Sequence, residues 1–120
     1  GWSPDNTRFY LADSGRRTIY VYDYDLDTGT VTNKQVFARF ADADGMPDGL
    51  AIDAQGHVWC AMWDGWAIKR FAPDGTLVRS IDLPVPRPTS CCFGGENRLL
   101  RAQSRRAAFV RCEKFVILAA

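Results

Sequence analysis

The sequence predicts an all-β fold made of repeated antiparallel sheets, and three observations support this prediction. Short runs rich in Val, Ile, Tyr, Phe and Trp alternate with clusters of Gly, Pro, Asp and Asn, which is typical of strands joined by tight turns. Apolar residues are nowhere spaced at helical intervals over three turns, so we expect almost no helix before residue 100. A sequence pattern typical of a strand, a turn and a second strand also recurs along the chain, as repeat architectures require.

The first third of the chain predicts a three-stranded meander. RFYLAD (8–13) follows the turn-forming text SPDN, and TIYVYDYD (18–25) alternates between two sets of side chains. The text LDTGT then ends this second strand, where Gly29 supplies the backbone freedom of a hairpin turn. KQVFARF (34–40) closes the meander.

Four further strands are predicted, separated by the tight-turn sequences AQG, WDG and PDG. They span residues 49–53, 57–62, 67–72 and 76–83.

An internal repeat decides the architecture. Residues 47–62 align without gaps on residues 88–103, 41 positions later, and WSPDNTRFYLAD is a variant of the same unit with Tyr10 in the place of Trp59. Four short antiparallel strands per repeat are typical of a propeller blade, which buries its faces only against neighbouring blades. The alternative is an immunoglobulin-like sandwich, which needs about seven strands in roughly 100 residues and has no such repeat.

The length of the chain limits how much of a propeller it forms. A closed propeller takes about four blades or more, and 120 residues hold about two and a half units. We therefore expect either a fragment of a longer chain or self-association through the uncovered blades.

The text after residue 98 departs from the repeat. In the gapless alignment Arg101 and Gln103 fall on the places of Cys60 and Met62, which predicts that one face of this strand turns polar. We therefore divide the chain into a partial propeller domain, residues 1–98, and a divergent tail, residues 99–120, predicted to be helical or disordered.

Composition and charge exclude several classes of function. The 15 basic and 14 acidic residues are well mixed for most of the chain, which argues against a nucleic-acid partner. The longest apolar run, 115–120, is far shorter than the roughly 20 residues of a membrane helix, and no signal segment opens the chain. We expect a soluble, cytoplasmic protein with no membrane partner.

The cysteines and the single histidine do not indicate a zinc site. Cys60, Cys91, Cys92 and Cys112 form no C-x-x-C pair and have no histidine at ligand spacing. Cys91 and Cys92 are adjacent in a predicted strand, so their side chains should point to opposite faces. We interpret the cysteines as small buried apolar residues and His57 as a turn residue without a chemical role.

Two long phrases carry a family resemblance. They run from GWSPDNTRFYLAD to KQVFARF and from MPDGLAIDAQG to PTSCCFGG, and together cover residues 1–95 almost continuously. The chain resembles the senescence marker protein, gluconolactonase and luciferin-regenerating enzyme family of regucalcin-like proteins. This resemblance implies a fragment of a six-bladed β-propeller from a divalent-metal-dependent hydrolase that opens sugar lactones such as gluconolactone. The alternative is a non-catalytic, propeller-derived binding or interaction module that keeps the blades without the site.

The same resemblance assigns the site residues. It implies a divalent metal (Ca, Zn, Mn or Mg) at the mouth of the central channel, held by a Glu, an Asn and an Asp. The Asp stands in the P-D-G before a strand, which is Asp48 here. The Asn belongs to a stretch of which only Gly1 remains before Trp2, and the Glu belongs to the first blade. One ligand of three is present, so we expect Asp48 to be both metal ligand and catalytic base, and the isolated chain to be inactive.

The acid-rich text around Asp48 also has simpler explanations. DADGMPDGLAID (42–53) fails as an EF-hand loop because Met46 and Pro47 stand at its fifth and sixth positions. Pro-Asp-Gly by itself predicts a turn, as its second occurrence at 73–75 illustrates. The family position favours Asp48 as a metal ligand.

The neighbouring polar and aromatic residues receive weaker assignments. We expect Asp42 and Asp44 to solvate the loop. The side chains of Trp63, Asp64 and Trp66 in WDGW could flank the channel and contact a sugar, but packing between blades is favoured.

Overall fold

A computed structural model describes residues 1–94, 98–104 and 110–111, and these residues form an all-β structure whose only helical element is a 3₁₀ turn, Asp42–Asp44. The strands are β1 (Arg8–Asp13), β2 (Thr18–Asp25), β3 (Thr30–Arg39), β4 (Met46–Ile52), β5 (Val58–Trp63), β6 (Ala67–Phe71), β7 (Leu77–Asp82), β8 (Pro88–Gly94), β9 (Leu99–Ser104) and β10 (Val110–Arg111). They form three antiparallel sheets: a first sheet β1-β2-β3, a middle sheet β4-β5-β6-β7 and a third sheet β8-β9-β10. The predicted all-β class is confirmed.

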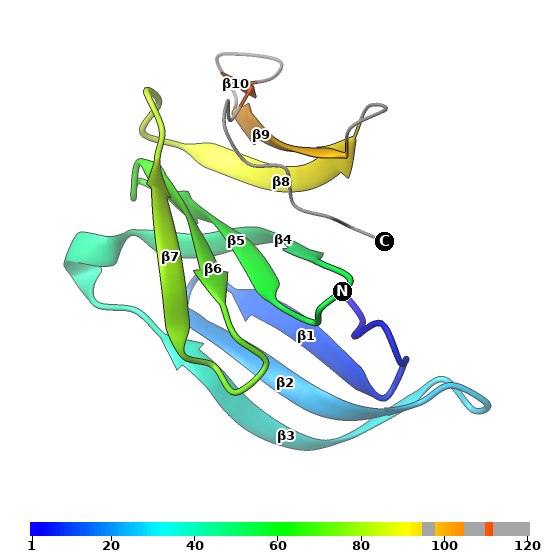
Figure 1. Cartoon of the computed structure of the whole chain (residues 1–120). Helices are drawn as coiled ribbons and strands as arrows, with labels where there is room; N and C mark the ends of the chain where they lie inside the picture. The colour runs from blue at the N-terminus through cyan, green and yellow to red at the C-terminus, as the bar shows by residue number, and fades with distance from the viewer. Residues whose placement is uncertain (95–97, 105–109, 112–120) are drawn as a thin grey trace.

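The middle sheet lies between the other two (Figure 1), and each of its faces contributes to a hydrophobic core shared with one neighbouring sheet. Strand β5 shows why, because successive side chains of a strand point to opposite faces. Cys60 and Met62 pack with Tyr10 and Ile19 of the first sheet, whereas Trp59 packs with Leu100 of the third sheet. This arrangement, in which each sheet buries its faces against its neighbours, is that of consecutive propeller blades and confirms the predicted architecture.

The repeat between the first and middle sheets is also confirmed. Gly1 exchanges two backbone hydrogen bonds with Tyr10, of 2.7 and 3.0 Å, just as Ala51 pairs with Trp59. Tyr10 and Trp59 are both buried, each in the core shared with the next sheet along the chain. The two aromatic residues therefore hold equivalent places in successive blades.

The gapless alignment of the third unit is right for its first strand and wrong by one residue for its second. Leu50 pairs with Cys60, but Cys91, its equivalent, pairs with Ala102 rather than Arg101. The chain from Cys91 to Ala102 is one residue longer than the chain from Leu50 to Cys60, and a shift of one residue exchanges the two faces of a strand.

With the observed register, the polar face of β9 does not lie in the core. Ala102 and Ser104 are buried and take the places of Cys60 and Met62, whereas Arg101 takes the place of Trp59 and is exposed, like Gln103. The core side of β9 therefore remains apolar except for Ser104.

Part of the predicted tail belongs to the third sheet. Leu99–Ser104 form β9, paired with β8, rather than a helix. The tail residues 105–109 and 112–120 lie outside the described residues. In the part of the chain that is described, no helix is long and apolar enough to cross a membrane.

Candidate functional site

Asp48 lies within strand β4, which is the edge strand of the middle sheet and packs between β1 and β8. The sequence predicted that this strand begins at residue 49, after a Pro-Asp-Gly turn, but it begins at Met46. The second Pro-Asp-Gly, 73–75, does form a turn, in which Gly75 N–H donates to Ala72 O at 2.9 Å. The same tripeptide, Pro-Asp-Gly, therefore forms a strand at one place and a turn at the other, because different segments pack against it.

A β-bulge separates Asp48 from the regular part of the strand. Pro47 pairs with Met62 and Leu50 pairs with Cys60, so Asp48 and Gly49 together lie opposite one residue of β5. Bulges of this kind change the direction in which a side chain points and are common next to active sites.

Gly49 allows the neighbouring strand β8 to approach the bulge. A Cβ atom at this position would lie 2.7 Å from Ser90 Cα and 2.7 Å from Thr89 O. Only glycine fits such a close approach of two backbones. The bulge that carries Asp48 therefore lies against the third sheet.

The carboxyl group of Asp48 is half-buried and has no charged partner among the residues that the structure describes. Burial raises its pKa above the ordinary value, and the N–H of Gly49 offsets this only in part. Within residues 1–94, 98–104 and 110–111, no side chain forms an ion pair or a hydrogen bond with it. A desolvated carboxylate without a partner is suited to accept a proton or to bind a cation.

The thiol of Cys60 next to Asp48 is chemically inert. Burial, together with the negative charge of Asp48, raises the pKa of Cys60 to about 12. A thiol with such a pKa is neither a nucleophile nor a metal ligand at neutral pH, because both roles require the thiolate.

Residues of the first sheet hold the segment that leads into β4. Ser14 Oγ donates to Pro47 O at 2.6 Å, and Arg17 Nη1 donates to Gly45 O at 2.7 Å. The position of Asp48 is therefore set from both sides, by the first sheet and by β8.

The two aspartates of the 3₁₀ turn have different surroundings. Lys69 Nζ lies 2.6 Å from Asp44 Oδ1, and this hydrogen bond holds the pKa of Asp44 below its ordinary value. The expected role of solvating the loop is therefore wrong for Asp44, which ties the loop to β6. Asp42 contacts Arg17 at 3.1 Å but keeps 96% of its side chain exposed, as expected.

Asp53, at the other end of β4, is a buried carboxylate that the sequence did not single out. It accepts hydrogen bonds from Trp59 Nε1 at 3.0 Å and Arg70 Nη2 at 2.8 Å, and from the backbone N–H groups of Gln55 and His57. Its role is to close the β4–β5 turn. In the sequence, the only sign of this role is that Trp59, a hydrogen-bond donor, follows Asp53 by six residues. That spacing is too weak a signal to predict a buried carboxylate.

The described cysteines follow the predicted strand geometry. Cys91 is buried and Cys92 is exposed, so their side chains do point to opposite faces. The interpretation as buried residues is right for Cys60 and Cys91 and wrong for Cys92. Cys112 lies outside the described residues.

The WDGW turn between β5 and β6 is not simply buried between blades. Trp63 is half-buried, but Trp66 keeps 54% of its surface exposed, so the favoured packing role is wrong for Trp66. Arg87 Nε donates to Asp64 Oδ1 at 2.6 Å, which ties this turn to the segment before β8.

The described residues do not form a complete metal site. Carboxylate oxygen is the ligand that hard divalent cations prefer, so Asp48 fits the role chemically. No group of three His, Cys, Asp or Glu side chains among the described residues could hold a metal ion. Further ligands would have to come from other residues.

Comparison with known proteins shows similarity over most of the chain. Residues 1–100 match the SMP-30/Gluconolactonase/LRE-like region. The pentonolactonase XacC of Haloferax volcanii is 38% identical over 95 residues, which cover 79% of this chain and 33% of that protein.

Two solved structures share the fold. A luciferin-regenerating enzyme superposes with a TM-score of 0.82 at 34% identity, covering 86% of this chain and 35% of the other. A calcium-binding protein, regucalcin, from Agrobacterium tumefaciens superposes with a TM-score of 0.79 at 30% identity, covering 87% and 36%. The chain spans about a third of the length of the relatives it matches.

Proposed function

This chain belongs to the SMP-30/Gluconolactonase/LRE-like family, and from this we propose that it is part of a metal-dependent sugar-lactone hydrolase of the gluconolactonase type. Asp48 is its metal ligand and its general base. The substrate is a small sugar lactone, and the metal is calcium, zinc, manganese or magnesium. The names of two similar proteins, a pentonolactonase and a calcium-binding regucalcin, support this assignment.

The observation that carries the proposal is the environment of Asp48. Four other described aspartates have shifted pKa values, and in Asp5, Asp44, Asp53 and Asp74 the shift is downward. Among the described carboxyl groups with a shifted pKa, only that of Asp48 is shifted upward. A structural carboxylate is stabilised by its partners, whereas a desolvated one without partners is typical of a functional site.

Asp48 has a direct role in the proposed hydrolysis. Hydrolysis of a lactone adds water to the carbonyl carbon and breaks the ring C–O bond, so the attacking water must lose a proton. Asp48 accepts this proton as the general base. When bound, a divalent cation would supply polarisation of the carbonyl group. The chain's own contribution is to hold the carboxylate at the bulge beside β8.

The repeat supports a position for one further ligand. Gly1 is equivalent to Ala51, so the position equivalent to Asp48 in the first sheet falls ahead of Gly1. The family resemblance implies an asparagine ligand at that position. We therefore propose that this chain carries one ligand and that the 120 residues in isolation have no appreciable lactonase activity.

A chimera tests the proposal. Residues 1–94 would replace the matching third of the Haloferax pentonolactonase, and hydrolysis of gluconolactone and a pentonolactone would be followed by acid release at constant pH. We expect activity that a chelator abolishes and that Asp48→Asn reduces at least a hundredfold.

Asp74→Asn is the matched control, since it changes the other Pro-Asp-Gly, in an exposed turn, and should leave the activity unchanged. A chimera that is equally active with and without the Asp48→Asn substitution would refute the assigned role. A folded chimera without activity would favour the alternative, a non-catalytic binding module.

A further inference from the structure

We propose that Trp66, together with Asp64 and Arg87, binds the hydroxylated ring of the substrate. This inference rests on the proposed function, because it takes the ligand to be a sugar lactone. It concerns a surface formed by the WDGW turn and the segment between β7 and β8, which none of the assigned roles of Asp48 requires.

The backbone of Trp66 is strained in a way that packing does not explain. Its φ angle is +54°, a region that bulky residues rarely occupy and that glycine or asparagine occupy more easily. The side chain is 54% exposed, so the core gains little from it. Strain of this kind collects at ligand-binding positions, which indicates that the exposed indole has a role of its own.

The strained residue is held in place from the other side of the turn. Leu83 N–H donates to Trp66 O at 2.7 Å, and Trp66 N–H donates to Pro86 O at 3.4 Å. The partner segment carries prolines at positions 84, 86 and 88, whose fixed φ angles limit its freedom. The indole is therefore presented on a rigid base, which lowers the entropy lost on binding.

Two charged groups lie on the WDGW turn and on the segment that holds it. Arg87 Nε donates to Asp64 Oδ1 at 2.6 Å, and the Arg87 guanidinium lies 5.2 Å from the centre of the Trp63 ring. Both side chains remain about half exposed, so one pair offers an acceptor and several donors to solvent.

A sugar ring matches this combination of groups. Its C–H bonds form an apolar face that can pack on an indole, and its vicinal hydroxyls both donate and accept hydrogen bonds. A purely apolar ligand would cover the polar atoms of the Asp64–Arg87 pair without hydrogen-bonding to them, and the pair has no net charge with which to attract a simple anion. The chemistry of the surface therefore favours a neutral polyhydroxylated ring.

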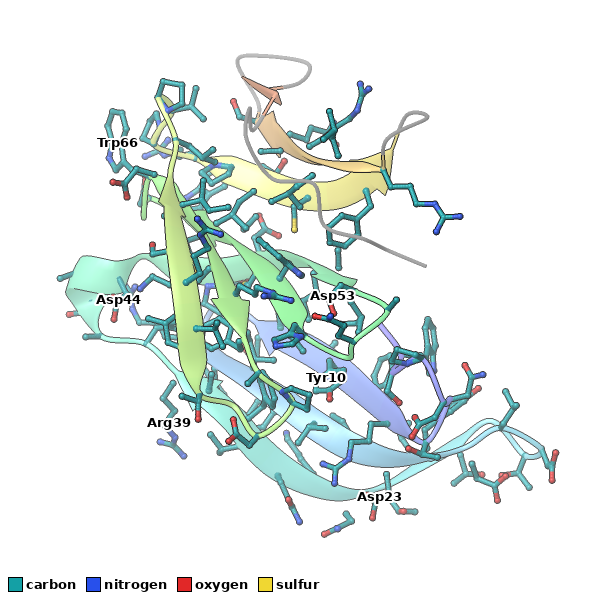
Figure 2. The ribbon with its side chains drawn as sticks, viewed as in Figure 1. Tyr10, Asp23, Arg39, Asp44, Asp53 and Trp66 are labelled. Carbon is teal, nitrogen blue, oxygen red and sulfur yellow. The ribbon has the colours of Figure 1, made fainter. Side chains whose placement is uncertain are left out.

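The surface lies at the same end of the molecule as the approach to Asp48. Met46, two residues before Asp48, pairs with Trp63. Gly45 and Gly65 allow close contact between the two loops, since a Cβ atom on either would collide with the backbone of the other loop. Figure 2 shows Trp66 and Asp44 toward one end of the middle sheet and Asp53 toward the other.

A non-hydrolysable lactone analogue, glucono-1,5-lactam, tests the inference with the 120-residue chain. Binding would be measured by saturation-transfer NMR with irradiation of the indole protons, and by titration of tryptophan fluorescence. Trp66→Ala and Trp66→Gly should weaken binding at least tenfold, and Asp64→Asn should weaken it severalfold. Trp66→Gly also relieves the positive φ, so an unchanged or raised Tm would show that lost binding is not lost folding.

Trp2→Ala is the matched control, because Trp2 is 50% exposed but lies in the first sheet. It should bind the lactam like the unmodified chain. Absence of lactam binding to the unmodified chain, equal binding by the Trp66 variants, or a loss that is as large in Trp2→Ala would each overturn the inference.

The chimera separates this inference from the proposed function. There we expect Trp66→Ala to raise KM about tenfold with kcat unchanged, as for a residue that holds substrate without taking part in the chemistry. Lactonase activity insensitive to Trp66 would refute the sugar surface alone. Lactam binding by a chimera without activity would refute the proposed function alone.

Discussion

Replacing Asp53 by asparagine should destabilise the chain more than any other single change of an aspartate. The carboxylate is fully buried and accepts four hydrogen bonds. Two come from the turn that follows β4. The other two come from the indole of Trp59, in the core shared with the third sheet, and from the guanidinium of Arg70 on β6.

The expected magnitude follows from these partners. Asparagine keeps one oxygen for the two backbone donors, but its amide N–H groups would face two further donors, Trp59 Nε1 and Arg70 Nη2. Breaking a buried ion pair on one side costs about 3–5 kcal/mol, and an orphaned buried donor costs about 1–3 kcal/mol. Because Arg70 keeps 18% of its side chain exposed and such losses overlap, we expect about 3–5 kcal/mol in total.

Urea unfolding followed by tryptophan fluorescence measures this loss as a change in the free energy of unfolding. Asp74→Asn serves as the control, since Asp74 accepts hydrogen bonds in an exposed turn and should lose less than about 1 kcal/mol. A double-mutant cycle with Arg70→Met isolates the ion pair. A loss below about 1 kcal/mol for Asp53→Asn would refute the reasoning, because Trp59 Nε1 and Arg70 Nη2 would then have found other acceptors.

The pH dependence of stability gives an independent check. Burial by itself would raise the pKa of Asp53, but the hydrogen bonds from Trp59 and Arg70 outweigh it, and the net pKa lies below the ordinary value. The stabilisation is therefore present above the pKa of an unfolded aspartate, about 3.9, and is lost as the pH falls through the lower pKa of the folded chain. The Asp53→Asn variant should lack this contribution to acid unfolding.

Four further predictions concern other sites. Asp48→Asn should raise the free energy of unfolding at pH 7, because burial raises the pKa of Asp48; the gain, measured by urea unfolding, should be absent below about pH 4, grow as the pH rises from there to the raised pKa, and stay constant above it. Gly49→Ala should cost about 1–3 kcal/mol in the same assay, since its Cβ would collide with β8; an unchanged midpoint would contradict the close approach. Iodoacetamide at pH 8 should label Cys92 in the native chain and leave Cys60, with its pKa of about 12, unmodified by mass spectrometry; equal labelling would contradict the burial. The chain should self-associate in light scattering and Leu11→Lys should reduce this, because Leu11 is 44% exposed on the uncovered side of the first sheet; a stable monomer would argue against it.

The strands could be predicted from the sequence because each carries its own period-2 pattern or apolar run. The meander of the first sheet and the four strands of the middle sheet can be predicted from the local sequence pattern and the turn residues. The register of β9 could not be predicted in this way. One additional residue between the paired positions leaves the composition of the strand unchanged, yet it moves Arg101 out of the core and Ala102 into it.

The candidate site shows a similar division. Asp48 was predicted through the family resemblance, whereas its position in a bulge depends on pairing with β5, which no local pattern encodes. Asp53 was missed because the local sequence does not distinguish a buried aspartate in a turn from an exposed one. Only the fold brings Trp59 and Arg70 to its carboxylate. The exposure of Trp66 was missed because a tryptophan in a strand-rich chain is more often buried.

Strand β4 and the turn after it carry two carboxylates whose pKa values are shifted in opposite directions. This difference links stability to function. Asp53 is buried among donors and lowers the energy of the fold, whereas Asp48 is desolvated without them and raises it. A strand can keep a destabilising charge in place only if other contacts fix its backbone. Asp53 fixes one end of β4, while Ser14, Arg17 and Lys69 fix the other. The pKa of Asp48 should therefore fall toward its ordinary value when those anchors are weakened, as its carboxylate gains solvent.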